Sequence, residues 1–171
     1  LMSKKKKYIT LTILIAFSVY CSITIGRGLD EGPHLKQGKI TLDYLLSFGS
    51  IDKEIDYREY YSTIYWSLLY FVTEIFPSKY LWQVGHLFNS IFSIGVIFGI
   101  GKVCRELFNK KVSEIIFIIL FLYPVFFGHM SINNKDTILA LSHVWIIYLM
   151  LRYLKKQSIA EKANKYITSI G

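Results

Sequence analysis

The feature that most constrains this chain is an uncharged apolar run near its start, residues 8–25, which follows four consecutive lysines. As an α-helix this run would be about 27 Å long, close to the ~30 Å hydrocarbon core of a bilayer. A cleaved signal peptide also begins with basic residues, but its apolar region is about 7–15 residues long and ends at a small-residue cleavage site that is not evident here. We therefore predict a spanning helix over residues 8–26 whose lysine-rich start stays in the cytoplasm.

The composition agrees with a membrane protein. Hydrophobic residues make up 53% of the 171 residues and aromatic residues 16%, and the mean hydropathy of +0.37 exceeds that of ordinary globular proteins. The net charge of +8 comes from short basic tracts beside apolar runs, a pattern of membrane topology that predicts no nucleic-acid partner. The two cysteines, Cys21 and Cys104, provide no disulfide framework.

Charge also decides the role of the tyrosine-rich segment 62–76. Three more apolar segments, 81–101, 112–128 and 137–153, follow it. If residues 62–76 crossed the membrane, the basic residues of 102–111 would lie outside, against the positive-inside rule. If they lie along the outer surface instead, every basic tract is cytoplasmic. We predict an all-α, polytopic integral membrane protein with four spans and an interfacial helix over residues 62–76.

The first outer segment, residues 27–39, carries two adjacent carboxylates, Asp30 and Glu31, and the imidazole of His34. Its glycines and proline predict a turn instead of a continuing helix. Polar groups where the chain leaves the membrane suit surface chemistry; the alternative is that Asp30 and Glu31 are only a solvated charge pair at a helix end. The turn-forming residues are Gly28, Gly32 and Pro33.

The second outer segment, residues 127–137, lies on the same predicted side of the membrane. It combines hydrogen-bond donors, a cation and another carboxylate, while the alternative is that Asp136 only caps the following helix. The polar residues are His129, Asn133, Asn134, Lys135 and Asp136.

Two polar residues and several glycines mark the span 81–101. His86 and Asn89 lie three positions apart on one helix face near its outer end, where polar groups need partners or a function. Structural hydrogen bonding is the alternative to substrate binding. His143, inside the last span, is assigned no chemistry. Close helix packing is predicted for Gly85, Gly95, Gly99 and Gly101.

These segments together resemble the GT-C membrane glycosyltransferases, in the branch of the dolichyl-phosphate-mannose protein mannosyltransferases (glycosyltransferase family 39) and their bacterial polyprenyl-phosphate-sugar-dependent relatives. The resemblance covers most of the chain and depends on the order and spacing of short motifs. Two departures are Asn134, where many relatives have proline, and Ser62-Thr63, where they have Gly-Pro or Pro-Pro. The motifs are Asp30-Glu31, Tyr60-Tyr61, Gly85–Asn89, Arg105–Lys110, Pro124, Phe127–His129 and Ile132–Asp136.

The resemblance implies an inverting transfer of a sugar from a lipid-linked polyprenyl-phosphate donor to an acceptor hydroxyl of unknown origin at the outer membrane face. By it, Asp30 is the base that accepts the hydroxyl proton, Glu31 orients the acceptor or a neighbouring group, and Lys135 neutralises the leaving phosphate. No cofactor is implied, and no ligand cluster at recognisable spacing suggests a metal. Family members usually continue through further spans, so we expect this chain to be the N-terminal part of a longer enzyme. Further substrate-binding candidates are Asp136, Asn133, His129, His34, Arg58, His86 and Arg27.

The competing hypothesis is a non-enzymatic transporter or assembly subunit whose loop charges are solvated. A transporter predicts ionisable residues deep within its spans. Here the charges gather at one face and only His143 lies well inside a span. This distribution favours surface chemistry on a lipid-linked substrate.

Overall fold

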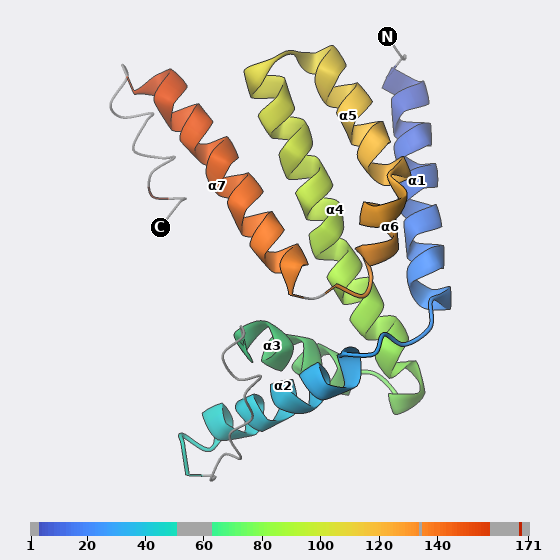
Figure 1. Ribbon diagram of the computed structural model, residues 1–171, viewed down its shortest axis with the longest axis vertical. Helices are drawn as coiled ribbons and strands as arrows, with labels where there is room; N and C mark the ends of the chain where they lie inside the picture. Colours follow the sequence, from blue (N-terminus) through green and yellow to red (C-terminus); the bar gives the residue numbers. More distant parts are fainter. Residues whose placement is uncertain (1–3, 51–62, 134, 158–167, 169–171) are drawn as a thin grey trace.

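The computed structural model describes residues 4–50, 63–133, 135–157 and 168 (Figure 1). Within these residues every regular element is a helix, which confirms the all-α prediction. The elements are α1 (Lys4–Thr24), α2 (Glu31–Leu46), α3 (Thr63–Glu74), the short 3-10 helix η2 (Ser78–Tyr80), α4 (Leu81–Leu107), α5 (Lys110–Leu122), α6 (Pro124–His129) and α7 (Asp136–Lys156).

Three helical stretches of the described chain are long and apolar enough to cross a membrane, namely Lys5–Thr24, Ser78–Leu107 and Asp136–Lys156. They coincide with three of the four predicted spans, so the protein is an integral membrane protein. Large apolar side chains remain exposed along α1, such as Ile13 at 61% and Phe17 at 54%. Such exposure is expected of a helix that faces lipid.

The predicted span 112–128 is divided into two helices. α5 has 13 residues. At about 20 Å it is shorter than the ~30 Å hydrocarbon core. Pro124 ends it, because proline restricts the preceding residue to extended conformations, and Tyr123 has φ −73° and ψ 111°. α6 then continues from α5 toward the end of the molecule where α7 begins (Figure 1). That α5 and α6 together cross the membrane stays a prediction.

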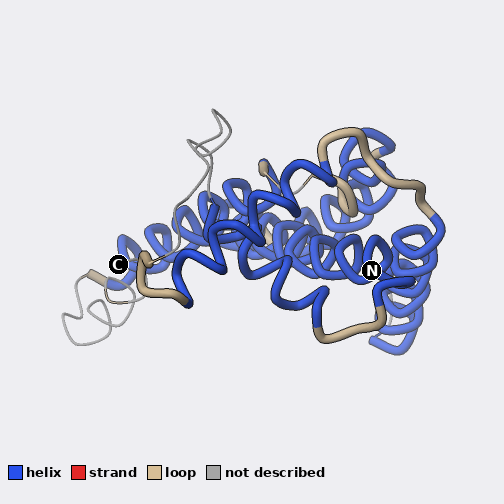
Figure 2. Tube along the Cα trace, turned by 90° about the horizontal axis from the view of Figure 1, so that it is seen from below, coloured by secondary structure: helices blue, strands red, loops and turns tan. Residues whose placement is uncertain are grey.

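α4 is the central helix of the fold and contacts α1, α3, α5 and α7. Figure 1 shows α1, α4, α5 and α7 running along one another, whereas α2 and α3 lie crosswise at one end, which Figure 2 views from below. The helix predicted over residues 62–76 is therefore found as α3, with the crosswise orientation expected of it. Its place at the membrane surface stays a prediction. α3 packs on α2 through a cluster of Tyr65, Trp66 and Leu69 that also contacts Leu35.

The turn predicted for residues 27–39 is wrong from Glu31 onward, because α2 begins there. Pro33 is tolerated since it lies in the first turn, where a backbone N–H has no helical partner. Gly38 lies inside the helix for a packing reason, because a Cβ atom there would overlap the backbone carbonyl of Trp66 on α3. The proline and glycine therefore mark a helix start and a helix contact.

The predicted close packing is confirmed for Gly95 and Gly99 of α4, whereas Gly85 and Gly101 have only ordinary contacts. A Cβ atom on Gly99 would lie 2.6 Å from Val144 Cγ1, and one on Gly95 would lie 2.9 Å from Leu141 Cδ1, so both glycines let α7 approach closely. Trp145 Nε1 also donates a hydrogen bond to the Gly95 carbonyl oxygen at 3.2 Å. These contacts fix α7 against α4 over successive turns.

The basic tracts gather at one end of the helices. Figure 1 shows the start of α1, the α4–α5 connection and the end of α7 at the same end of the molecule. Lys7 pairs with Glu114 of α5 at 3.0 Å, and Arg152 of α7 pairs with Glu106 of α4 at 2.9 Å. The polar segments that follow α1 and precede α7 lie at the opposite end. The grouping agrees with the predicted topology, whose cytoplasmic and outer sides stay predictions.

Candidate active site

Glu31 and His86 form a buried contact between α2 and α4. His86 Nε2 lies 2.8 Å from Glu31 Oε1, and the two residues are only 1% and 8% exposed, respectively. His86 Nδ1 lies 3.2 Å from the carbonyl oxygen of Ser22 on α1. A carbonyl oxygen only accepts hydrogen bonds, so Nδ1 must carry a hydrogen atom. The hydrogen bond between Nε2 and the Glu31 carboxyl group then contains one further proton, which belongs to one of these two groups. The backbone N–H of Gly28 donates to the other Glu31 oxygen at 2.6 Å.

The start of α2 explains how Glu31 is positioned. An acidic residue in the first turn of a helix can reach back to an N–H that has no helical partner, as in one half of a capping box. The bond between Glu31 and the Gly28 N–H has this form. It turns the Glu31 side chain toward α4, where His86 lies little more than one turn from the helix start.

Three serines connect the Glu31–His86 contact to the segment before α7. Ser22 Oγ lies 2.7 Å from Ser90 Oγ and 2.8 Å from Ser131 Oγ, and the Ser90 and Ser131 hydroxyls are 3.1 Å apart. All three serines are buried. Because Ser22 also presents its carbonyl oxygen to His86, hydrogen bonds link the two polar segments through α1 and α4.

The carbonyl oxygen of Met130 is held by two side chains of α4. Asn89 Nδ2 donates to it at 3.0 Å and Ser93 Oγ at 2.8 Å. Asn89 Oδ1 accepts a hydrogen bond from the Tyr65 hydroxyl of α3 at 2.8 Å. Burial raises the pKa of Tyr65 well above its ordinary value, so this hydroxyl stays a donor even in alkaline solution. His86 and Asn89 thus make the hydrogen bonds that a structural role requires, and a role of His86 in substrate binding stays a prediction.

A cavity of about 190 Å³ lies beside this network, between α4, α6 and α7. His129, Asn133 and Asp136 line it. Asn133 Nδ2 donates to Asp136 Oδ2 at 2.9 Å, and the Asp136 N–H donates to Asn133 Oδ1 at 3.2 Å. The idea that Asp136 caps α7 is therefore wrong, because Asp136 is the first residue of the helix and Asn133 supplies the capping oxygen. Three predicted substrate-binding residues share one cavity.

Asp30 has a different environment from its neighbour Glu31. It is exposed, immediately precedes α2, and makes no capping hydrogen bond within the described start of that helix. The Arg27 guanidinium carbon lies 4.5 Å from the ring centre of Trp82. The same guanidinium group also packs against Gly32. The solvated-pair alternative therefore fits Asp30 but not Glu31, which is buried between two hydrogen-bond partners.

Two further predicted residues, His34 and Lys135, lie within the described part of the chain. The His34 ring stacks on Trp66 with 4.0 Å between ring centres, between α2 and α3. Lys135 directly precedes α7 and is half-buried, next to the cavity-lining Asp136. Among described side chains, no group of three or more His, Cys, Asp or Glu is placed to hold a metal ion. Outside the described residues lie Arg58, Asn134, Tyr60 and Tyr61.

The polar residues that sequence analysis missed are mostly serines. A serine in an apolar span attracts little notice, since its hydroxyl can bond to its own helix. The available signal was position: Ser90 and Ser93 continue the helix face that starts with His86 and Asn89. The missed residues are Ser22, Ser90, Ser93, Ser131 and Tyr65.

The model of the family described as dolichyl-phosphate-mannose-protein mannosyltransferase matches residues 63–163. The match extends from α3 to beyond α7, and so includes His86, the α4 serines and the cavity beside α7. No curated protein and no solved structure matches the chain.

Proposed function

This chain belongs to the dolichyl-phosphate-mannose-protein mannosyltransferase family of membrane glycosyltransferases, and on that basis we propose that it moves a sugar from a polyprenyl-phosphate-linked donor to an acceptor hydroxyl at the outer membrane face. The main observation that supports the position of the site is that two adjacent acids have different environments. Glu31 is buried against His86, while Asp30 is exposed beside it. Family membership favours this function over a non-enzymatic transporter or assembly subunit.

In the proposed reaction, the acceptor oxygen attacks the anomeric carbon from the face opposite the lipid phosphate. The bond from that carbon to the phosphate oxygen breaks, and the phosphate leaves with the electron pair, so the configuration is inverted. The hydroxyl proton passes to Asp30. The exposure of Asp30 and its lack of a capping bond support this role, because a general base has to reach the incoming hydroxyl.

Glu31 has a positioning role in this proposal. Both of its carboxylate oxygens already have partners, His86 and the Gly28 N–H, so it is poorly placed to receive the acceptor's proton. It instead fixes the helix start on which Asp30 lies. A rigid support of this kind keeps the base within reach of the reacting atoms.

We assign the leaving phosphate to the segment before α7. Lys135 supplies the cation, and the start of α7 adds backbone N–H groups and the positive end of the helix dipole. His129 and Asn133 border the adjoining cavity and would contact the phosphate or the sugar. The Asp136 carboxylate orients the Asn133 amide.

The two segments must enclose one substrate for this reaction to occur. The hydrogen bonds from Ser131 through Ser22 to His86 and Glu31 support that arrangement, because they join the phosphate side to the base side. Arg27, beside the start of α2, is a second cation available to the lipid phosphate.

The proposal is tested by Asp30→Asn in the full protein. The amide keeps the size and hydrogen bonding of the side chain but accepts no proton, so we expect kcat to fall about 10²–10⁴-fold with donor binding retained. The measurements are sugar transfer from a polyprenyl-phosphate sugar and, in parallel, donor binding. Near-normal turnover by a folded, membrane-inserted variant would refute Asp30 as the base.

Two further variants separate the remaining roles. Glu31→Gln should fall between the wild type and Asp30→Asn, because it disturbs positioning only. Lys135→Ala should weaken donor binding and slow phosphate departure. Lys39→Ala is the matched control, since it removes an exposed lysine of α2 and should leave both measurements unchanged.

A further inference from the structure

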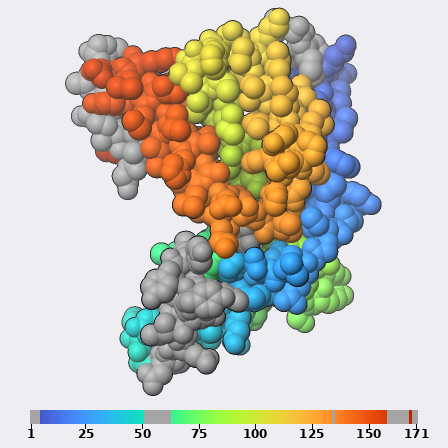
Figure 3. All heavy atoms as spheres, viewed as in Figure 1, coloured from blue at the N-terminus to red at the C-terminus, as the bar shows by residue number. Residues whose placement is uncertain are grey.

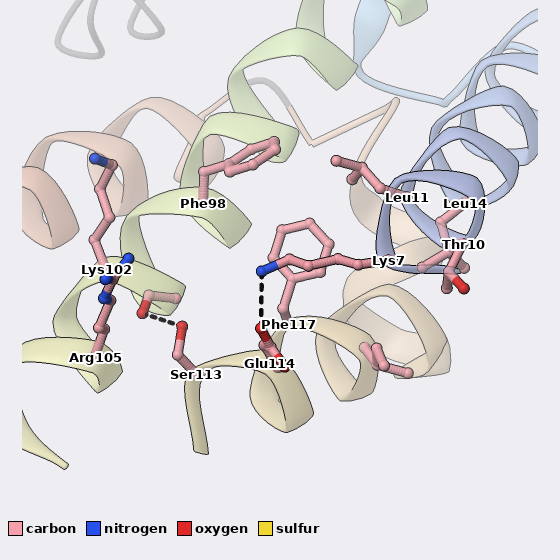
Figure 4. Close-up of a pocket in the computed structure, with 12 residues that line it drawn as sticks. Lys7, Thr10, Leu11, Leu14, Phe98, Lys102, Arg105, Ser113, Glu114 and Phe117 are labelled. Atoms are coloured by element: carbon pink, nitrogen blue, oxygen red, sulfur yellow. Dashed lines mark hydrogen bonds and ion pairs between the residues drawn. The ribbon is translucent and has the colours of Figure 1, made fainter. Parts of the chain in front are cut away.

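A second and larger cavity lies at the basic end of the molecule, among α1, α4 and α5 (Figure 4). Its volume is about 240 Å³. It is remote from the Glu31–His86 contact, because it lies along the C-terminal part of α4, from Phe98 to Arg105, whereas His86 lies in the second turn of that helix. Neither the family match nor the proposed transfer reaction assigns it a role.

The walls of this cavity are divided between apolar and cationic groups. Leu11 and Leu14 of α1, Phe98 of α4 and Phe117 of α5 form an apolar part, as Figure 4 shows. Charged side chains occur toward the helix ends. A ligand that suits both parts has an apolar chain and a charged head.

The charge of the lining is positive. It contains three cations, Lys7, Lys102 and Arg105, and one carboxylate, Glu114. Lys7 is paired with Glu114 at 3.0 Å, and the Lys102 ammonium lies 5.2 Å from the ring centre of Tyr148 on α7. Among the ion pairs of the described residues none includes Arg105, so its guanidinium is available to an anion.

The position of the cavity indicates where that anion comes from. α1 and α4 are long and apolar enough to span a bilayer, so we expect the basic residues at their ends to lie near the lipid head groups. Basic pockets between spanning helices bind the phosphates of acidic lipids, which Lys and Arg near the surface attract. A soluble phosphate would leave the apolar walls without a partner.

We propose that the cavity among α1, α4 and α5 binds one acidic phospholipid, with its phosphate at Arg105 and Lys7 and the first part of an acyl chain against Leu11, Leu14 and Phe98. The guanidinium of Arg105 presents paired N–H donors to phosphate oxygens. Lys7 shares its ammonium between Glu114 and the phosphate. The site is independent of the proposed sugar transfer.

The experiment uses the full protein, delipidated in detergent and titrated with phosphatidylglycerol or phosphatidylcholine, with bound lipid counted by native mass spectrometry. We expect one phosphatidylglycerol to bind in preference to phosphatidylcholine. Arg105→Gln should weaken that binding about 5-fold, as expected for one cation beside a lipid phosphate. Arg105→Lys keeps the charge and should retain most of the binding.

Two controls make the result specific to the cavity. Lys111→Gln removes an equal charge from an exposed residue at the same end but outside the lining, and should have no effect. Glu114→Gln removes the one acid of the lining and releases Lys7, so it should strengthen binding. An effect of Lys111→Gln equal to that of Arg105→Gln would overturn the proposal in favour of general surface charge.

Soluble anions distinguish a lipid from a free phosphate. Inorganic phosphate and glycerol phosphate are added at the same concentration as phosphatidylglycerol, and neither should displace it. Displacement by either anion would overturn the proposal, because it would mean that the apolar walls contribute nothing. Equal binding of phosphatidylglycerol and phosphatidylcholine would also overturn it.

Discussion

At the residue scale, the burial of Glu31 has to be offset by its partners. Removing a carboxylate from water costs several kcal/mol, and a buried pair recovers this only when its other hydrogen bonds are also made. Glu31 satisfies this condition, because His86 and the Gly28 N–H occupy both of its oxygens. The pair is therefore stable only as a complete unit.

His86→Phe tests this dependence. The variant keeps a ring of similar size but leaves Glu31 buried with a single partner, so we expect the free energy of unfolding to fall by about 3 kcal/mol. The measurement is unfolding in detergent micelles followed by circular dichroism. His143→Phe is the matched control, because His143 is exposed on α7 and its hydrogen bond among the described residues is to the Leu139 carbonyl of its own helix. A loss no greater than that of the control would contradict the role given to His86.

The division between Asp30 and Glu31 could not be predicted from the sequence. Two adjacent side chains point in different directions from a helix, and which of them points inward depends on the residue at which α2 begins. The sequence did identify Asp30 and Glu31 as candidate site residues at the end of a span. It also predicted that His86 needs a partner or a function, but not that residue 31 is its partner.

At the scale of elements, spans and packing glycines were predictable and the start of α2 was not. A long apolar run in a bilayer has to satisfy its own backbone hydrogen bonds, which it does as a helix. α1, α4 and α7 could therefore be predicted from hydropathy alone. Pro33 is ambiguous, because proline suits both a turn and the first turn of a helix. The contact with Trp66 that explains Gly38 belongs to tertiary structure.

Gly38→Ala tests the contact between α2 and α3. The new methyl group would overlap the Trp66 carbonyl, and backbone cannot turn aside as a side chain can. We expect the free energy of unfolding to fall by about 1–3 kcal/mol, the usual cost of overpacking. Gly85→Ala is the control, since its methyl would meet only Leu69 Cδ1 at 3.8 Å. That variant should be stabilised by up to about 1 kcal/mol of helix propensity. Equal stability of the two variants would contradict the close contact.

At the scale of the whole molecule, α4 joins two chemically different ends. One end holds the buried polar network and the crosswise helices, and the other holds the basic tracts and the cavity among α1, α4 and α5. On the face shown in Figure 3 only the start of α7 comes near α2, and Ile138 of α7 and Leu35 of α2 contact the same α3 cluster. The sequence predicted the two ends because alternating spans return each basic tract to one side. It did not predict which helices are neighbours, since lipid-facing and helix-facing apolar residues look alike in sequence.

Cysteine labelling tests the sides of the membrane, in a background without Cys21 and Cys104. A cysteine at Leu29, which is 98% exposed beside Asp30, should react with an impermeant maleimide in intact cells, whereas one at Phe108 in the basic connection should not. Gly128 tests the divided crossing, because its Cβ position is open and it follows α5 and most of α6. If α5 and α6 cross together, Gly128→Cys reacts from outside; if they turn back, it is protected like Phe108→Cys. Reaction at Phe108 with protection at Leu29 would reverse the topology and place Asp30 and Lys135 in the cytoplasm, away from the outer face where the transfer is proposed.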